Sequence, residues 1–468
     1  MHRVGCAIAL ALVACAPTIA GTVPRHVQNW QTACANAGQS CLESRNVGIS
    51  ASWMAKHVDW NEVGDHPSSD VTSAQLAAAG AEHIVVYSDP NIAWYCPVPQ
   101  DYSAQSYDLP ETGGNCRTSV ARYLRPENGS YAHAFTHQID GNRLFDRADG
   151  FYHGRPGEPL NIGDRDVQAA FAADTARNRY ATDVFEDDAG GSYNCIADDN
   201  GRCSGTYGAA AYAPPGCDYR DGYWCYKYGE TAYEFDRASN PQQTYADDAI
   251  ALADASAHPV IGNDGVGTDV YDLQWLASRR VEGAMSEGAW TQVSNPKKWI
   301  AEADAILRYH NLHKYVVEYS SDASRLMFQI ASHWIVYDST YSIEALDEVN
   351  PAARSAGRND ATFPEESVVP SNARVATPLS NEVTVFETAP GLFVREYATC
   401  YENGEVIGYC AAIVNATGSA QPIAGLTRRY SRVLVHNTTA TWAAGGTPLW
   451  SHIVPESIGP NSGLILAE

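Results

Sequence analysis

Residues 281–319 read VEGAMSEGAWTQVSNPKKWIAEADAILRYHNLHKYVVEY, and this stretch decides the fold. It opens with the short apolar run Val281–Glu287, which is typical of a buried strand. Asn295, followed directly by a proline, predicts the start of a helix over Asn295–Asn311. The β-branched run Tyr315–Tyr319 comes next. A strand, a helix and a second strand in this order predict a parallel β-α-β unit.

The same alternation extends through most of the chain. Further helices are expected at Ser73–Gly80, at Thr244–His258 and at Asp164–Tyr180, where Asp164 is the cap. The eight candidate strands are short apolar or β-branched runs: Val47–Trp53, His83–Ser88, Tyr131–His137, Asp183–Asp187, Pro259–Asp264, Val281–Glu287, Tyr315–Tyr319 and Trp334–Asp338. Eight strands separated by helices predict an α/β fold, a (β/α)8 TIM barrel, which we place at residues 21–350.

Two long insertions interrupt the barrel pattern, Trp94–Gly129 after the second predicted strand and Ala189–Gln243 after the fourth. Insertions after strands lie on the carboxyl face of a barrel, where substrates bind. The second insertion is rich in tyrosine, whose rings stack on the apolar faces of sugars. A small disulfide-stapled core explains the same tyrosines, and both interpretations stay open.

The composition and the hydrophobic pattern of the chain change after residue 350. Residues 351–378 are rich in Pro, Ala, Ser and Asn and are expected to be a linker. Alternating runs then predict a small all-β, sandwich-like domain over residues 379–468, with strands at Val383–Phe386, Leu392–Ala398, Val406–Val414 and Arg432–His436. The Asn-Gly pair at 403–404 predicts a tight hairpin between the second and third of these strands. We expect this domain to cover the barrel rather than to bind glycan.

The amino-terminal residues have the features of an export signal. A short basic head precedes the apolar run Val4–Ala14, which is too short to span a bilayer. We expect cleavage after Ala20, so that residues 1–20 are a signal peptide. The alternative is a lipobox that leaves Cys15 lipidated. Either outcome predicts an exported protein, periplasmic or secreted.

The remaining cysteines agree with export. They are Cys34, Cys41, Cys96, Cys116, Cys195, Cys203, Cys217, Cys225, Cys400 and Cys410. An even number in an oxidising compartment predicts a disulfide framework, and we expect sequential pairing, although other connectivities remain open. The last pair flanks the predicted hairpin turn. Because the sequence has no CxxC pair and no histidine at zinc-type spacing, we expect no metal at these cysteines.

Composition and motifs exclude several classes of function. The formal net charge of −24 repels nucleic acid and anionic lipid, and leaves neutral or amine-bearing glycans as substrates. The sequence has no GxSxG, HExxH, GxGxxG or phosphate-loop motif, which argues against serine hydrolases, zinc proteases and nucleotide enzymes. We therefore expect neither a cofactor nor a catalytic metal. The segment 198–200, Asp-Asp-Asn, leaves a structural calcium site as an alternative.

Acidic residues stand at the ends of the last five predicted strands. They are Glu186, Asp187, Asp188, Asp264, Glu287, Glu318 and Asp338. Like charges crowded at one end of a barrel repel and cost desolvation, which favours a functional reason for them. Hydrolysis of a glycosidic bond needs two carboxyl groups, one that protonates the leaving oxygen and one that attacks the sugar or activates water. The ends of the fourth and sixth strands can flank one such bond.

Two of these strand ends carry a resemblance to known glycosidases. Residues 185–188, Phe-Glu-Asp-Asp, resemble the F-x-D-D/N strand end of several glycosidase barrels. Residues 281–287 resemble the v-D-G-v-x-x-E strand of the endo-α-1,4-polygalactosaminidase family, with Glu282 where that family often has Asp. The resemblance implies a retaining glycoside hydrolase in which Asp187 is the nucleophile and Glu287 the acid/base. The long cysteine-bearing insertion departs from the family pattern.

Further residues are expected to bind substrate around this pair. They are Asp188, Asp264, Glu318, Asp338, Asp89, Trp53 and His137. Asp188 is also the alternative nucleophile, since the strand phase is open by one residue. Asp89 equally fits a plain turn, and His137 equally fits a structural role. A second function remains open, namely a barrel that binds a poly- or oligosaccharide without cleaving it.

Overall fold

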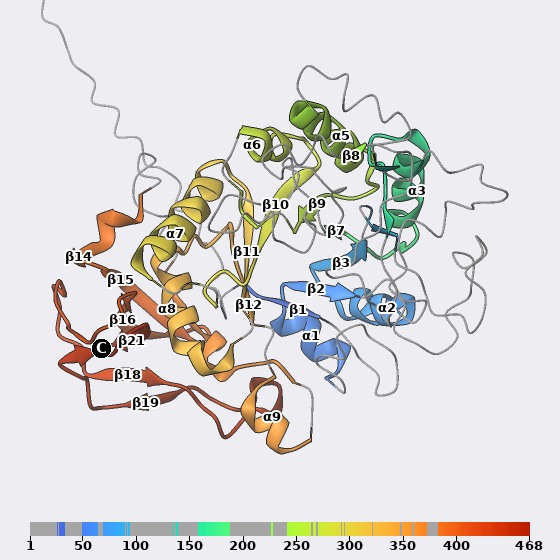
Figure 1. Cartoon of the computed structure of the whole chain (residues 1–468). Helices are drawn as coiled ribbons and strands as arrows, with labels where there is room; N and C mark the ends of the chain where they lie inside the picture. The colour runs from blue at the N-terminus through green and yellow to red at the C-terminus, as the bar shows by residue number, and fades with distance from the viewer. Residues whose placement is uncertain are drawn as a thin grey trace, which may run out of the picture.

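The computed structural model describes residues 26, 28–32, 49–63, 69–88, 90, 92–93, 134, 137–138, 158–187, 226–227, 241–263, 265–267, 270–291, 293, 295–320, 322–346, 349–357, 360–371 and 382–468. An eight-stranded parallel sheet forms its centre (Figure 1). In sheet order its strands are β1 Trp30–Thr32, β2 Trp60–Val63, β3 His83–Ser88, β7 Asp183–Glu186, β9 Val260–Gly262, β10 Val281–Glu287, β11 Tyr315–Ser320 and β12 Ser342–Leu346.

The sheet closes on itself. Asn29, just before β1, forms a parallel bridge with Glu344 of β12, and the amide of Glu344 donates to the carbonyl of Gln28 at 2.9 Å. Every neighbouring pair of barrel strands is parallel. The predicted (β/α)8 barrel is therefore confirmed.

Helices cover the outside of the barrel and connect its strands. They are α1 Ala51–His57, α2 Ser69–Ala79, α3 Arg165–Thr175, α5 Pro241–Ala255, α6 Val270–Leu276, α7 Pro296–Asn311 and α8 Leu326–Val336. Side chains cap the first turns of α3 and α7, and the cap at Asp164 was predicted. The Asp164 side chain accepts from the amides of Asp166 and Val167, and the Asn295 side chain accepts from Lys298.

The inside of the barrel is filled by alternate residues of its strands. Large rings and branched side chains pack there, namely Trp30, Trp60, Val85, Tyr87, Phe185, Ile261, Met285, Val317, Ile343 and Ala345. Trp30 meets the ring of Phe185 edge-on at 5.6 Å. The barrel is thus a packed core and not a pore.

Three predicted strands were wrong. Residues 51–53 lie in α1 because Ser50 caps a helix there and accepts from the amide of Trp53. The run Trp334–Asp338 spans the end of α8 and the turn after it. This helix is buried on all sides between the barrel and the C-terminal sheet, so its apolar run looks like that of a strand. Within Tyr131–His137, only Ala134 and His137 are described, and His137 starts β5 (His137–Gln138), which pairs with β8 (Tyr226–Lys227) outside the barrel.

An antiparallel sheet follows the barrel and forms most of the C-terminal β-domain (Figure 1). Its strands are β13 Val368–Pro370, β14 Glu387–Ala389, β15 Leu392–Glu402, β16 Glu405–Asn415, β18 Arg432–Val435, β19 Leu449–Ser451 and β21 Ser462–Ala467. The run Val383–Phe386, predicted as a strand, is the 3-10 helix η9. The expected linker holds α9 Pro351–Ser355, η8 Pro364–Ser367 and the strand β13.

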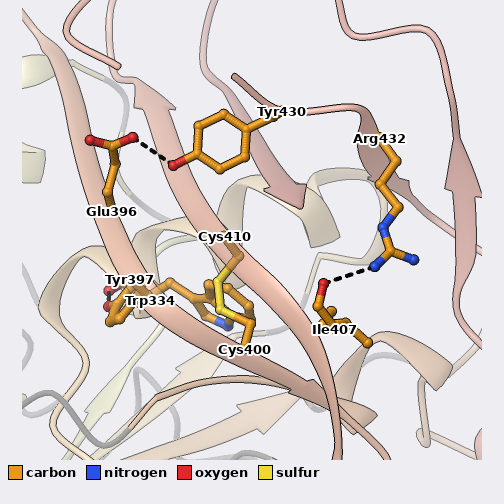
Figure 2. The surroundings of a disulfide bond; sticks show 8 residues. All are labelled: Trp334, Glu396, Tyr397, Cys400, Ile407, Cys410, Tyr430 and Arg432. Atoms are coloured by element: carbon orange, nitrogen blue, oxygen red, sulfur yellow. Dashed lines mark hydrogen bonds between the residues drawn. A yellow bond between two sulfur atoms is a disulfide. The ribbon is translucent and has the colours of Figure 1, made fainter. Parts of the chain in front are cut away.

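The predicted hairpin joins β15 to β16. Asn403 and Gly404 both have positive φ, of 50° and 84°, as a tight hairpin turn requires. Cys400 and Cys410 form a disulfide bond across the two strands, beside Trp334 of α8 (Figure 2). This pairing was predicted. The other eight cysteines beyond residue 20 lie outside the described residues.

Candidate active site

Three polar side chains stand together at the carboxyl end of the barrel. Asp187 follows β7, Asn263 follows β9 and Glu287 is the last residue of β10. The amide of Asn263 donates to the carbonyl of Glu186 at 2.8 Å, and the amide of Asp187 donates to the carbonyl of Ser88 at 3.0 Å. Backbone hydrogen bonds between neighbouring strands therefore fix the main-chain positions of Asn263 and Asp187.

The side-chain amide of Asn263 joins the two acids. Its nitrogen donates to Oδ1 of Asp187 at 3.0 Å and to Oε2 of Glu287 at 3.0 Å. Because both bonds end on one nitrogen, the two carboxylate oxygens lie no more than about 6 Å apart. The two hydrogens of a planar amide diverge by about 120°, which sets the separation near 5 Å. The structure thus brings the two predicted acids to one small space.

A phenol holds the other side of Asp187. Tyr87, on the neighbouring strand β3, donates its hydroxyl to Oδ2 of Asp187. Asp187 therefore accepts on both oxygens from two different strands, which fixes the plane of its carboxylate. Glu287 is exposed and reaches over the same space from β10.

The loop that carries Asn263 is held in an uncommon conformation. Gly265 and Val266 have φ of 70° and 50°, and such a φ is strained for a β-branched residue. The amide of Gly265 donates to the carbonyl of Met285, and the hydroxyl of Tyr309 donates to the carbonyl of Gly267 at 2.8 Å. Val266 is itself buried, so packing maintains the turn that aims Asn263.

Glu62 is another acid on an inward-facing position. It lies near the end of β2, and its Oε2 accepts from the indole of Trp30 at 2.9 Å. The sequence did not point to Glu62, Tyr87 or Asn263. In the sequence, only a position at the end of a strand could have indicated these three residues. For Glu62 this indication is missing, because β2 has four residues and is too short to be recognised as a strand.

Four predicted site residues lie outside what the structure describes. Asp188, Asp264 and Asp89 belong to the undescribed positions, and so does the side chain of His137. The Asp-Asp-Asn segment at 198–200, suggested as a calcium site, also falls there.

The remaining three predicted residues are not with the two acids. Glu318 is 1% exposed on the outer face of β11, because Val317 and Tyr319 take the inward positions. Asp338 lies in the turn before β12, at the opposite end of the barrel, and accepts from the amide of Thr340. Trp53, on α1, packs edge-on against Trp442 of the β-domain at 5.4 Å. The expectation that these three line the substrate site is corrected by their positions.

Among the described residues, no group of three or more His, Cys, Asp and Glu side chains is placed to hold a metal ion. Within the same part of the chain, no helix combines the length and the apolar character that crossing a bilayer requires.

Fold and site together define a (β/α)8 barrel with two bridged carboxylates at its carboxyl end. No family model matches this sequence, and no curated protein does either. Among solved structures, the alpha-glucosyl transfer enzyme XgtA is 11% identical with a TM-score of 0.42, over 94% of this chain and 98% of that one.

Two further solved structures are similar to the same extent. Trehalose-6-phosphate hydrolase (TreA) of Bacillus licheniformis is 8% identical with a TM-score of 0.45, over 95% and 99% of the two chains. An inactive double mutant of MutB, in complex with isomaltulose, is 8% identical with a TM-score of 0.44, over 94% and 98%. At such identities and TM-scores the likeness carries no argument about activity, so the function has to be argued from the site.

Proposed function

We propose that this protein is a glycoside hydrolase of the retaining type, with Asp187 as nucleophile and Glu287 as acid/base. The observation that carries the proposal is the double hydrogen bond from Asn263 to both carboxylates. The resulting separation, about 5 Å, agrees with the roughly 5–5.5 Å of retaining enzymes and is shorter than inversion requires. Inverting enzymes need room for a water between the general-base carboxylate and the sugar.

The two carboxyl groups have complementary tasks in this mechanism. Asp187 attacks the anomeric carbon while Glu287 gives its proton to the leaving oxygen, which departs as an alcohol. A water molecule then attacks the glycosyl-enzyme, Glu287 takes a proton from it, and the bond to Asp187 breaks. Tyr87 and Asn263 hold the Asp187 carboxylate on both oxygens, which supports a fixed direction of attack.

A neutral or amine-bearing glycan is the substrate class that we propose. The net charge of −24 favours a cationic polymer over a polyanion. The sequence resemblance to endo-α-1,4-polygalactosaminidases makes α-linked polygalactosamine the first polymer to test. Export is part of the same proposal, and the Cys400–Cys410 disulfide supports an oxidising compartment. Cleavage after Ala20 or lipidation of Cys15 remains as predicted from the sequence.

The test is release of sugar from a panel of neutral and amino-sugar polysaccharides, with polygalactosamine among them. Glu287→Gln and Asp187→Asn are each expected to lower turnover by about 10²–10⁴ while the polymer still binds, because each removes a proton or a nucleophile and keeps the shape. Glu405→Gln, at an exposed position in the β-domain hairpin, is the matched control and should keep full activity.

Two results would speak against the proposal. Wild-type protein that binds a polymer without releasing sugar from it would support the alternative, a glycan-binding barrel. Activity that survives Glu287→Gln on an unactivated substrate would remove Glu287 from the role of acid/base.

A further inference from the structure

Glu318 has surroundings that a surface acid does not have. It lies on the outer face of β11 under α8, and both its side chain and that of His333 are at most 1% exposed. Nδ1 of His333 approaches Oε1 of Glu318 at 3.0 Å. Burial lowers the pKa of His333, but Glu318 and Glu344 outweigh it, so that the pKa of His333 is raised overall. The pair is therefore a buried carboxylate held beside a protonatable ring.

The second oxygen of Glu318 is occupied by a tryptophan of the active-site loop. The indole Nε1 of Trp290 donates to Oε2 of Glu318 at 2.7 Å, and both groups are buried. Trp290 is the third residue after Glu287, beyond a glycine with φ of 75°. The chain between them turns tightly, so a shift of Trp290 moves Glu287.

The rest of this loop is fixed from the same side. The amide of Ala289 donates to the carbonyl of Tyr319 at 3.0 Å. The guanidinium of Arg325, just before α8, donates to the carbonyls of Thr291 and Val293 at 2.8 and 3.1 Å. These contacts hold the backbone of the loop, whereas the Trp290 side chain is held by its hydrogen bond to Glu318 and by packing against the ring of Trp299 at 5.8 Å.

A buried ion pair is an expensive way to stabilise a protein. Desolvation of the two charges can exceed their attraction, and apolar side chains of equal volume often stabilise as well or better. Charge does strengthen and direct a hydrogen bond, because a carboxylate is a better acceptor than a neutral oxygen. The geometry thus favours a positional role over a purely stabilising one.

We propose that Glu318 and His333 are positioning residues for Glu287. His333 fixes the Glu318 carboxylate, the carboxylate fixes the indole of Trp290, and the indole fixes the turn that presents Glu287 to Asn263. This inference rests on the proposed function, since it assigns the pair to the acid/base of that reaction. It concerns side chains that touch neither substrate nor the reacting atoms.

The test compares two leaving groups in three variants. The probes are phenyl and 2,4-dinitrophenyl glycosides of galactosamine, or of whichever sugar the polymer panel releases. Dinitrophenolate leaves without help from an acid, whereas phenolate needs the proton of Glu287. Trp290→Phe removes the indole donor and keeps an aromatic ring, and Glu318→Gln removes the charge and keeps one acceptor oxygen. Trp450→Phe is the matched control, since its indole also donates to a glutamate, Oε2 of Glu402 at 2.9 Å, within the β-domain.

A positioning role predicts that kcat/KM falls for the phenyl glycoside and hardly changes for the dinitrophenyl glycoside. Trp290→Phe and Glu318→Gln should lower kcat/KM about tenfold for the phenyl glycoside and less than about twofold for the dinitrophenyl glycoside. Trp450→Phe should affect both substrates equally. Equal losses on both substrates in Trp290→Phe, or no loss on either, would overturn the proposal, since neither pattern involves the acid/base.

A second readout does not depend on turnover. In a crystal structure of Trp290→Phe, Oε2 of Glu287 should leave hydrogen-bond range of the Asn263 nitrogen, where the wild-type distance is 3.0 Å. In Trp450→Phe the Glu287 carboxylate should stay within range. An inactive wild type would therefore overturn the proposed function alone. A Glu287 carboxylate that stays in place in Trp290→Phe would overturn the positioning role alone.

Discussion

Replacing Glu366 by glutamine is expected to flatten the dependence of the unfolding free energy on pH. Glu366 lies on η8, between the barrel and the β-domain, and is buried. Its Oε1 accepts from the side-chain amide of Asn29 at 3.1 Å, and its Oε2 accepts from the backbone amide of Phe363 at 2.6 Å. Burial raises the pKa of Glu366 from 4.5 to about 8, against the lowering effect of these two hydrogen bonds.

The sign and size of the effect follow from that shift. Between pH 4.5 and about 8 the folded protein keeps a proton that the unfolded chain has released. The stability that Glu366 contributes is therefore complete below pH 4.5 and is lost as the pH rises through about 8. At about 1.4 kcal/mol for each unit of pKa shift, the loss amounts to about 5 kcal/mol.

The assay is urea unfolding at pH 5 and pH 9, followed by circular dichroism. Glu366→Gln is neutral at both values, so between pH 5 and pH 9 its unfolding free energy should change by about 4 kcal/mol less than that of the wild type. At pH 5, where Glu366 is protonated, the variant should be less stable than the wild type by about 1–3 kcal/mol, because glutamine offers one acceptor oxygen where Glu366 uses two. The exposed Glu405→Gln is the control. If the unfolding free energies of the wild type and of Glu366→Gln changed equally between pH 5 and pH 9, the reasoning would be refuted.

Two smaller predictions concern local features of the chain. Cys410→Ser should lower the unfolding free energy by about 2–3 kcal/mol, because it opens a disulfide of sequence separation 10, and a reductant should then destabilise the wild type by about that much more than the variant. Asp164→Ala should cost about 1 kcal/mol in the same unfolding assay, because α3 loses the side chain that caps the amides of Asp166 and Val167. If either variant unfolded at the same urea concentration as the wild type, the corresponding disulfide or cap would not stabilise the protein as expected.

The elements that could be predicted are those with a local signal. The unit made of β10, α7 and β11 was found because a proline marks the start of its helix and apolar runs flank it. The turn at Asn403 and Gly404 was found because its residues allow positive φ. The residues within such a feature are sufficient to specify it, so it can be predicted without knowledge of tertiary contacts.

The elements that could not be predicted depend on packing. β1 and β2 are only three and four residues long, too short for an alternating pattern to stand out. α8 is apolar on all sides because the barrel covers one face and the β-domain another, so its sequence lacks the polar stripe of an ordinary surface helix. The eighth strand was consequently placed one element too early.

The candidate site shows the same division. Asp187 and Glu287 could be named because acids at strand ends are visible in the sequence. Tyr87 and Asn263 could not, since only the register of β3, β7 and β9 brings their donors to Asp187. Glu318 was misplaced because β11 continues to Ser320, and alternation then turns Glu318 away from the barrel interior.

The buried acids gather where the barrel closes and where the β-domain attaches. Glu318 and Glu344 are register partners on β11 and β12, and Glu344 also bridges Asn29 at the closing edge. Asn29 donates to Glu366, so the closure of the barrel and the segment that leads into β13 share one hydrogen bond. The apolar core runs without a break from α8 into β15 and β16. Because closure and domain attachment depend on the same groups, barrel and β-domain should unfold in one transition, and the protonation of Glu366 acts on both.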